Sequence, residues 1–403
     1  MEEIENYIRV GTTLYKISQR PLLEGGYIET RIAWTYDTFK QDYKDKAKPN
    51  IKKYDGFCAV PSHVNYKRDI GKPPYIYYNE YELISHQPNE GDCPHILSFI
   101  SHIFEEQNEL GLDYMQLLYL HPEQKLPIIL LVSPEGNTGK TTFLNLLKMI
   151  FENNVIFNTN EDFRSPFNGD WARKLIIAID EALLDRREDA ERIKNLSTAK
   201  YYKVEYKGKD RYETEFFAKF VLCANNDLDA IKISPHETRY WVRKVQEITE
   251  SRKDSTILDK MKSEIPHFLH FLENRKFTTI KKSRMWFAPE LLKTDALKRI
   301  IAYNQGTVEV EILKLFSELF SLSKKDELLY CSTDIQHFLN ELDFEVSKTQ
   351  LRNIFQNKLK IYPLKQQRYN YISGGNNGEI LEEKRNGRPY LIKKELVDKL
   401  LLQ

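Results

Sequence analysis

The sequence predicts an α/β protein, and three observations carry this prediction. Between residue 126 and about residue 246, short apolar runs alternate with stretches whose apolar residues recur at helical spacing. The runs are LPIILLV, KLIIAID and AKFVLCA, and the main helical stretch is TTFLNLLKMIF. Continuous apolar runs are typical of parallel strands covered by helices on both faces. The third observation is a glycine-bearing segment that joins the first run directly to that helix.

Length and composition favour a globular chain with more than one domain. The 403 residues are enough for two or three domains of ordinary size. Hydrophobic residues make up 41% and charged residues 30%, which excludes a collagen-like or wholly disordered chain. The net charge is only +1, so any affinity for a polyanion must come from local clusters.

The compartment is predicted from cysteine usage and from the lack of targeting signals. Cys58, Cys93, Cys223 and Cys331 are far apart and form no C-x-x-C pair, which argues against a disulfide framework and a structural zinc site. The N-terminus has no basic region followed by an apolar run, and the longest apolar stretch, residues 126–132, is far shorter than a membrane span. We therefore expect a cytoplasmic protein that is neither secreted nor inserted in a membrane.

Three domains are expected along the chain. Residues 1–88 carry short strand-like pieces between Pro and Gly turns and predict a small N-terminal α+β domain whose role stays open. Residues 89–302 hold amphipathic helices over 95–119, the α/β core and further helices. Residues 303–403 are expected to form a third, basic domain.

The most specific motif is the segment SPEGNTGKTT, from Ser133 to Thr142. A nucleoside triphosphate needs backbone N–H groups around its phosphates, a lysine on the β/γ oxygens and a hydroxyl on Mg²⁺. The residues predicted to bind ATP are Gly136, Asn137, Thr138, Gly139, Lys140, Thr141 and Thr142, with Thr141 as a metal ligand. Pro134 replaces the first glycine of the usual pattern, which leaves Gly136 free to take a positive φ. A helix-capping turn with the same letters is the alternative.

Two later strand ends carry polar residues of the right kind for phosphate chemistry. The run KLIIAID ends in Asp180 and Glu181; we assign Asp180 to Mg²⁺ and Glu181 to the hydrolytic water. The run AKFVLCA ends in Asn225, whose amide can hydrogen-bond the γ-phosphate or the attacking water. Solvated acids at the end of a buried strand and an ordinary Asn-Asn turn are the alternatives.

The loop, the acid pair and the strand-end Asn, at their short spacing, resemble a superfamily 3 helicase, one of the compact AAA+ ATPases of small viruses, phages and plasmids. More narrowly, residues 94–246 resemble the helicase part of phage and mobile-element primase-helicases, the poxvirus D5-like group. The resemblance is good over about residues 90–250, loose in the C-terminal part and only general before that. It implies an AAA+-type core, a ring that is usually hexameric, ATP at subunit boundaries, single-stranded DNA in the pore and work inside a bacterial host cell.

The resemblance suggests functional roles for two further segments. Residues 202–215 alternate like a hairpin, and in a ring its cations would face DNA phosphates. The cations are Lys203, Lys207, Lys209 and Arg211. Arg239 resembles the arginine that a neighbouring subunit inserts onto the γ-phosphate, and Arg243 is the second candidate. A solvated surface hairpin and routine surface ion pairs are the alternatives.

The C-terminal segment is locally basic. From Lys348 to Lys394 there are eleven Lys or Arg and three Glu, a net charge of +8. Its order of helix, strand, glycine-rich loop and strand suits a winged helix, and the expected DNA contacts are Lys348, Arg352 and Arg388. A protein-docking winged helix is the alternative. The histidines, His102 among them, lack metal-ligand spacing, and we expect structural hydrogen bonds from them.

These inferences together predict an ATP-dependent helicase or translocase on single-stranded DNA that serves the replication of a phage or mobile element, with ATP and Mg²⁺ bound. The expected partners are single-stranded DNA, further copies of the chain in a ring, and a separate primase or polymerase, because residues 1–88 lack an acidic D-x-D metal motif. Two other functions stay open: an ATP-switched DNA-binding initiation or loading protein without processive unwinding, and a nucleotide-dependent protein remodeller.

Overall fold

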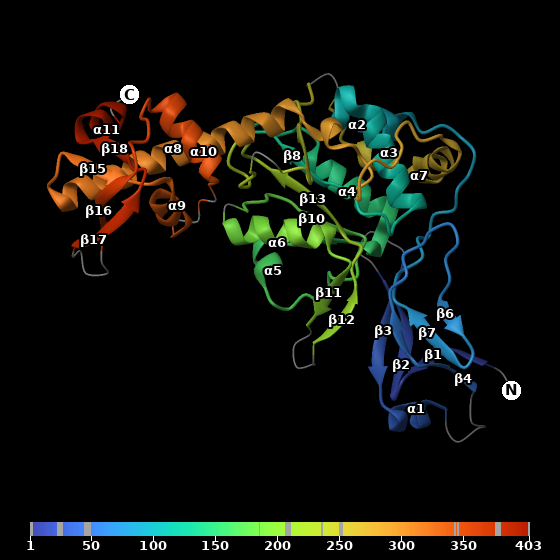
Figure 1. The fold of residues 1–403 in the computed structure, drawn as a ribbon. Helices are drawn as coiled ribbons and strands as arrows, with labels where there is room; N and C mark the ends of the chain where they lie inside the picture. The colour runs from blue at the N-terminus through green and yellow to red at the C-terminus, as the bar shows by residue number, and fades with distance from the viewer. Residues whose placement is uncertain are drawn as a thin grey trace.

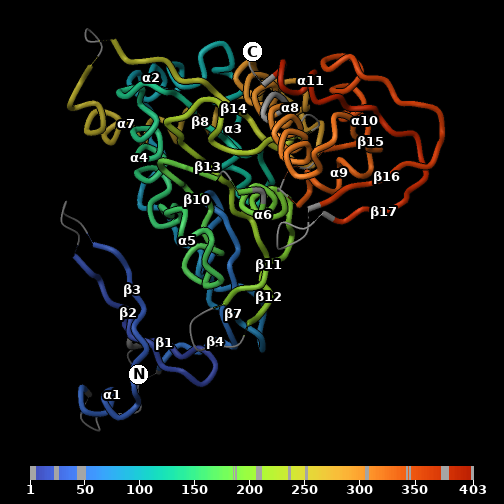
Figure 2. The backbone as a smooth tube through the Cα atoms, turned by 90° about the vertical axis from the view of Figure 1, so that its left-hand side faces the viewer, coloured from blue at the N-terminus to red at the C-terminus, as the bar shows by residue number. Residues whose placement is uncertain are grey.

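The computed structural model describes residues 3–21, 27–43, 50–184, 186–205, 211–234, 237–249, 253–341, 344, 346–374 and 380–401. The N-terminal strands lie below a central body (Figure 1 and Figure 2), and the C-terminal elements lie at the far end of one long helix, α8 (Figure 1). That helix spans Asp295–Ser323. In the described part of the chain, every helix is too short or too polar to span a bilayer.

Two small sheets build the N-terminal part. The first has the order β3-β2-β1-β4 and the second the order β5-β7-β6. The elements are β1 (Glu3–Val10), β2 (Thr13–Pro21), β3 (Tyr27–Trp34), α1 (Tyr36–Tyr43), β4 (Asn50–Tyr54), β5 (Gly56–Cys58), β6 (Asp69–Lys72) and β7 (Tyr75–Asn79). The two sheets pack on each other through a small core that includes Ile8, Val10, Tyr54 and Tyr78.

A five-stranded parallel sheet forms the centre of the molecule. Its order is β14-β8-β13-β10-β9, and every neighbouring pair is parallel. The strands are β8 (Ile128–Val132), β9 (Val155–Phe157), β10 (Ile176–Ile179), β13 (Lys219–Ala224) and β14 (Tyr240–Lys244). The prediction of a parallel α/β sheet is thus confirmed, and the three apolar runs are β8, β10 and β13.

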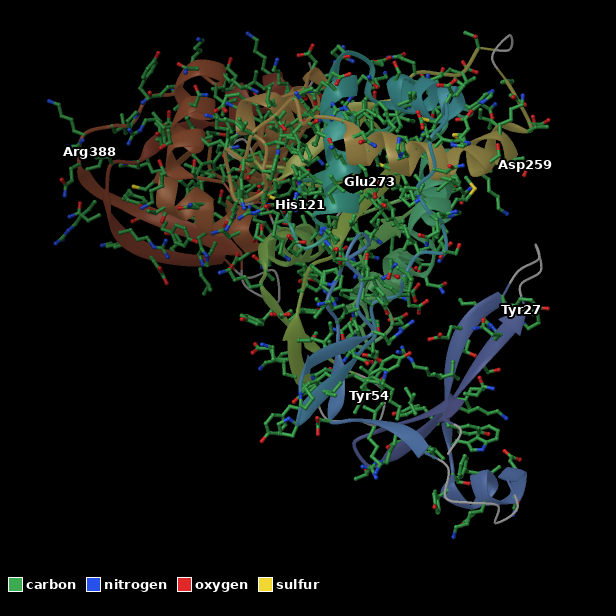
Figure 3. All side chains as sticks on the ribbon, turned by 90° about the vertical axis from the view of Figure 1, so that its right-hand side faces the viewer. Tyr27, Tyr54, His121, Asp259, Glu273 and Arg388 are labelled. Carbon is green, nitrogen blue, oxygen red and sulfur yellow. The ribbon has the colours of Figure 1, made fainter. Side chains whose placement is uncertain are left out.

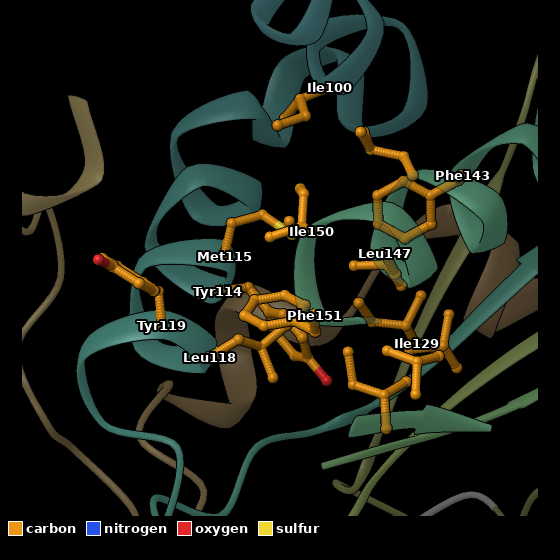
Figure 4. Packing of buried hydrophobic residues seen from close by; sticks show 14 of the residues in the cluster. Ile100, Tyr114, Met115, Leu118, Tyr119, Ile129, Phe143, Leu147, Ile150 and Phe151 are labelled. Atoms are coloured by element: carbon orange, nitrogen blue, oxygen red, sulfur yellow. The ribbon is translucent and has the colours of Figure 1, made fainter. Parts of the chain in front are cut away.

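Helices cover both faces of this sheet. The elements are α2 (Pro94–Phe104), η1 (Glu105–Gln107), α3 (Asn108–Leu120), α4 (Lys140–Phe151), η2 (Glu152–Asn154), α5 (Asn160–Arg164), α6 (Arg187–Thr198), α7 (Ile257–Asn274) and η4 (Pro289–Leu292). Ile129 and Leu131 of β8 pack with α2, α3, α4 and α7 (Figure 4), whereas Ile128 and Leu130 pack with α5, α6 and α8. Because both faces are buried, the strand needs apolar residues at every position.

The C-terminal part begins on α8. The first turns of α8, with Leu297 and Ile300, belong to the core of the central sheet, and the same helix from Val308 onward belongs to a separate core. The domain boundary predicted at residue 303 therefore falls inside one continuous helix. The remaining elements are β15 (Glu327–Tyr330), α9 (Ser332–Glu341), α10 (Lys348–Asn353), η5 (Ile354–Lys358), β16 (Gln367–Gly374), β17 (Ile380–Gly387), β18 (Tyr390–Lys393) and α11 (Lys394–Leu401). β15 pairs with β18, and β16 with β17, both antiparallel.

A buried carboxylate fixes the chain after α7 onto α3. Asp113 is fully buried and pairs with Arg275, and it also accepts hydrogen bonds from the backbone N–H groups of Thr278 and Thr279 at 3.1 and 2.7 Å. Burial alone would raise the pKa of Asp113, but the hydrogen bonds from Thr279, Arg275 and Thr278 outweigh burial and hold this pKa below its usual value. The carboxylate is therefore charged in the folded protein.

Replacing Asp113 with Ala is expected to lower the free energy of unfolding by about 3–5 kcal/mol, because the N–H groups of Thr278 and Thr279 lose their acceptor and Arg275 keeps Glu109 but loses its buried ion-pair partner. Urea denaturation measures the loss, and Asp259→Ala, an exposed carboxylate on α7, is the matched control. Since the folded-state pKa lies below the unfolded value of about 3.9, the stabilisation is complete above that pH and is lost as the pH falls through the folded pKa. A variant as stable as the control would contradict this role.

Candidate functional site

The predicted site residues meet at the carboxyl edge of the central sheet. Ala224 at the end of β13 pairs with Val132 at the end of β8, and Ile179 of β10 pairs with Leu222. The Ser133 N–H donates to the Ala224 carbonyl at 3.2 Å. The chain leaves β8 for β9 at one edge of the sheet, while β14 lies on the other side of β8. This is the kind of switch point at which open parallel sheets bind ligands.

The loop after β8 turns through two residues with positive φ. These are Asn137, with φ of 54°, and Gly139, with φ of 88°. Gly136, which the sequence leaves free to take a positive φ, does not take one; Asn137 adopts this conformation instead, which its short polar side chain tolerates. Space at Gly139 is also tight, because a Cβ there would lie 3.1 Å from the Phe99 ring.

Two contacts hold the loop from outside. The Ile248 N–H donates to the Asn137 carbonyl at 3.0 Å, and His102 Nε2 donates to the Thr138 carbonyl at 2.9 Å. In a trans peptide unit the carbonyl and the following N–H point in opposite directions. The N–H groups of Thr138 and Gly139 therefore point away from these partners. No residue in the described ranges accepts a hydrogen bond from either group, so both are available to an anion.

Lys140 is the first residue of α4, and its side chain reaches back to the loop. Its residue is 6% exposed, and Nζ donates to the Ser133 carbonyl at 3.2 Å, to Thr138 Oγ1 at 3.3 Å and to the Glu135 carbonyl at 3.4 Å. All three acceptors are neutral oxygens. Burial lowers the pKa of Lys140, and the neighbouring Asp180 and Glu135 oppose that effect. The ammonium is thus placed where a phosphate would find a cation that lacks a bound carboxylate.

The two predicted metal ligands are in contact. Thr141 Oγ1, at the start of α4, donates to Asp180 Oδ2 at 2.8 Å across 39 residues of sequence. A hydroxyl beside a carboxylate suits Mg²⁺, which prefers oxygen ligands and is usually completed by substrate phosphates and water. No group of three or more Cys, His, Asp or Glu in the described residues would hold a metal by itself. The pair therefore fits a magnesium ion that arrives with a triphosphate.

Glu181 and Asn225 follow the ends of β10 and β13, and among the described residues neither side chain has a hydrogen-bond partner. Glu181 is exposed and has a φ of 53°, an uncommon conformation for a residue other than glycine. Asn226 closes the turn after β13, because its Oδ1 accepts from the N–H groups of Leu228 and Asp229 at 2.9 and 3.0 Å. The Asn-Asn turn thus occupies Asn226, and the exposed Asn225 amide is available for a ligand.

The two candidate arginines lie in different places. Arg239 precedes β14, and its carbonyl accepts from the Ile128 N–H at 2.8 Å, which puts it at the amino edge of the sheet. Its guanidinium pairs with Glu237 at 2.8 Å and is 26% exposed. Arg243 is 4% exposed and contacts Glu106. The structure therefore makes Arg243 an internal link between β14 and η1, and leaves Arg239 near the surface.

The predicted hairpin consists of β11 (Tyr201–Val204) and β12 (Tyr212–Glu215) in antiparallel pairing. Lys207 and Lys209 lie outside the described residues. The other two cations have acidic neighbours: Lys203 is paired in register with Glu213, and Arg211 forms an ion pair with Glu205 at 2.6 Å. Lys203 and Arg211 are therefore partly neutralised by the hairpin's own carboxylates.

The three C-terminal cations are exposed but do not line one cavity. Lys348 and Arg352 lie on α10. Arg388, labelled in Figure 3, follows β17 and lines a cavity of about 710 Å³ with residues from the start of α9, such as Ser332. Neither Lys348 nor Arg352 belongs to that lining. Arg388 is thus associated with α9 and the β16–β17 hairpin.

His102 is a site residue that sequence reasoning did not find. Its replacement by Ala is expected to weaken nucleotide binding about fivefold, the equivalent of one hydrogen bond of about 1 kcal/mol, because the Thr138 carbonyl loses its fixed orientation. Titration with a fluorescent ATP analogue measures the dissociation constant. His337→Ala, an exposed histidine on α9, is the control. Equal affinity in the two variants would show that His102 does not orient the loop.

Comparisons with known proteins agree with this architecture. The profile of a family of unknown function, DUF5906, matches residues 131–243, from β8 to β14. A solved structure of the NrS-1 C-terminal region has a TM-score of 0.58 at 15% identity and covers 86% of this chain and 84% of that one. Another structure of that region has a TM-score of 0.55 at 14% identity over 87% and 85%. No curated protein matches the chain. At such low identity the likeness is one of fold.

Proposed function

We propose that this chain is an ATPase that binds Mg²⁺-ATP at the carboxyl edge of its central sheet and moves along single-stranded DNA as a helicase or translocase. The observation that carries the proposal is the 2.8 Å contact between Thr141 Oγ1 and Asp180 Oδ2. This contact joins the end of the phosphate loop to the acid pair. Phosphoryl transfer to water needs the phosphate-binding loop and the acid pair side by side.

Each residue has a role that follows from its position. The N–H groups of Thr138 and Gly139 and the Lys140 ammonium bind phosphate oxygens, and Thr141 and Asp180 hold Mg²⁺. When bound, Mg²⁺ supplies neutralisation of phosphate charge. The free Glu181 carboxylate orients the attacking water, and the Asn225 amide contacts the γ-phosphate or that water. Both Glu181 and Asn225 are exposed, and neither side chain has a competing hydrogen-bond partner in the described residues.

We propose an assembly of several subunits because Arg239 lies far from the phosphate loop of its own chain. Five residues of β14 separate Arg239 from the edge that carries the loop, which is about 17 Å along an extended strand. Arg239 therefore cannot reach a phosphate bound by its own chain. A neighbouring subunit can present it, as the resemblance to ring-forming AAA+ ATPases implies, and charge stabilisation by such an arginine is worth about 10³-fold or more in rate.

The strand order supports the roles proposed for the site residues. One strand, β13, is inserted between β8, which precedes the loop, and β10, which precedes the acid pair. The end of β13 therefore delivers Asn225 between the two motifs. The antiparallel pairs β15–β18 and β16–β17, with α9 and α10 between them in sequence, agree with a winged-helix-like C-terminal part. We propose on this basis, and on the resemblance to phage and mobile-element primase-helicases, a role in their replication.

A second candidate is an ATP-switched DNA-binding loading protein without processive unwinding. The charges of the described part of the hairpin favour it, because Lys203 and Arg211 both have acidic neighbours. A motor needs the hairpin to hold DNA phosphates through each cycle. Strand-displacement assays separate the two, since only the motor separates a duplex.

Lys140→Ala is expected to abolish ATP hydrolysis, at least 10³-fold, because the loop loses its only described cation while the fold is unaffected. Phosphate release measures hydrolysis, and the thermal unfolding midpoint checks the fold. Lys298→Ala, an exposed lysine on α8, is the control. Normal turnover by Lys140→Ala would refute the assignment of the nucleotide site.

Mixing two inactive variants tests whether Arg239 acts between subunits. Lys140→Ala and Arg239→Ala chains are each expected to lack hydrolysis, and mixed assemblies should recover a fraction of it. The reason is that some boundaries then combine an intact Lys140 of one subunit with an intact Arg239 of the next. Steady-state hydrolysis over a range of mixing ratios is the measurement. If both residues act within one chain, no ratio restores activity.

A further inference from the structure

The outer face of the small N-terminal sheet carries two exposed tyrosines. Alternate residues of a strand point to opposite faces. Tyr78 of β7 points inward and is 2% exposed, packed in the core with Tyr54. Tyr75 and Tyr77 therefore lie on the opposite face of the same strand, where they are 67% and 40% exposed. No described element covers these two rings.

The neighbours of these tyrosines are a lysine and a glycine of the flanking strands. In register, Lys72 of β6 lies opposite Tyr75, and Gly56 of β5 lies opposite Tyr77. A Cβ at Gly56 would be 3.1 Å from the Tyr77 ring, so the ring rests against glycine backbone. Within the three strands the only carboxylate is Asp69, which alternation places on the inner face, where it pairs with a lysine of β4 at 2.6 Å. The exposed Asp55, directly before β5, accepts from the Ile76 N–H of β7 at 2.7 Å. The outer face thus combines two rings with one cation.

This face is linked to the β11–β12 hairpin. Arg173, in the turn before β10, forms an ion pair with Glu80, directly after β7, and donates to the hydroxyl of Tyr212 in β12. Its guanidinium carbon lies 5.3 Å from the centre of the Tyr212 ring. Tyr77 is three residues before Glu80, about 10 Å along the strand.

We propose that the outer face of β6 and β7 is a second contact for single-stranded nucleic acid, continuous with the hairpin. Tyr75 and Tyr77 stack on two bases, and Lys72 neutralises a phosphate. Side chains two residues apart on a strand are about 7 Å from each other, a spacing that suits successive unstacked bases, and stacking of this kind requires no particular base. This inference rests on the proposed function and gives the N-terminal domain a role within it.

The test compares the binding of a fluorescein-labelled oligo-dT of about 30 nucleotides by fluorescence anisotropy. The double variant Tyr75→Ala, Tyr77→Ala is expected to bind at least tenfold more weakly, since each stacked base contributes about 1–3 kcal/mol. Tyr75→Phe, Tyr77→Phe should bind as the wild type does, because the rings remain. Tyr27→Ala is the matched control: Tyr27 is 72% exposed and lies at the far end of the β2–β3 ribbon (Figure 3).

Salt dependence and hydrolysis separate this inference from the proposed function. Loss of the tyrosines should leave the slope of log affinity against log salt unchanged, whereas Lys207→Ala with Lys209→Ala should reduce it by about 1.4 if both lysines contact phosphates. Wild-type affinity in the Tyr75→Ala, Tyr77→Ala variant, or an equal loss in Tyr27→Ala, overturns the inference alone. ATP hydrolysis without DNA is measured on the same samples, and its absence in the wild type contradicts the proposed function. In that case, tenfold weaker binding by the double variant would still support nucleic-acid binding by the outer face of β6 and β7.

Discussion

The hydrogen bond between Thr141 and Asp180 is the contact on which the candidate site depends. It exists because β8, β13 and β10 run parallel and end at one edge, so that residues 39 positions apart in sequence come within 2.8 Å. Two apolar cores, one on each face, hold these strands in register. A slip of one residue in β10 would turn Asp180 away from the loop. Packing in the sheet therefore sets the chemistry at its edge.

The loop is held by elements that lie outside the sheet, and this links the site to the rest of the molecule. His102 connects the loop to α2, and Ile248 connects it to the chain after β14. The first turn of α2 is in turn held by Glu264 of α7, whose Oε2 accepts from the Ile96 N–H at 3.0 Å. Since these contacts orient the carbonyls of Asn137 and Thr138, a shift of α2 or α7 would change the direction of the N–H groups that face the phosphate.

Sequence patterns predict the parts of this fold that local chemistry determines. The runs of β8, β10 and β13 were recognisable because both faces are buried. β9 has only three residues, and β14 contains the buried Arg243, so neither resembles an apolar run. The positive φ at Asn137 depends on the loop as a whole, and the partner of His102 is a carbonyl 36 residues away that no spacing rule identifies. The continuation of α8 across residue 303 was missed because one helix serves two cores.

A structure of the full chain with Mg²⁺ and a non-hydrolysable ATP analogue tests the central claim most directly. We expect the triphosphate between the N–H groups of Thr138 and Gly139 and the Lys140 ammonium. The metal should lie about 2.0–2.1 Å from Thr141 Oγ1, with the Asp180 carboxylate bound to it directly or through one water. A triphosphate bound elsewhere, or a metal without Thr141 in its coordination, would contradict the account.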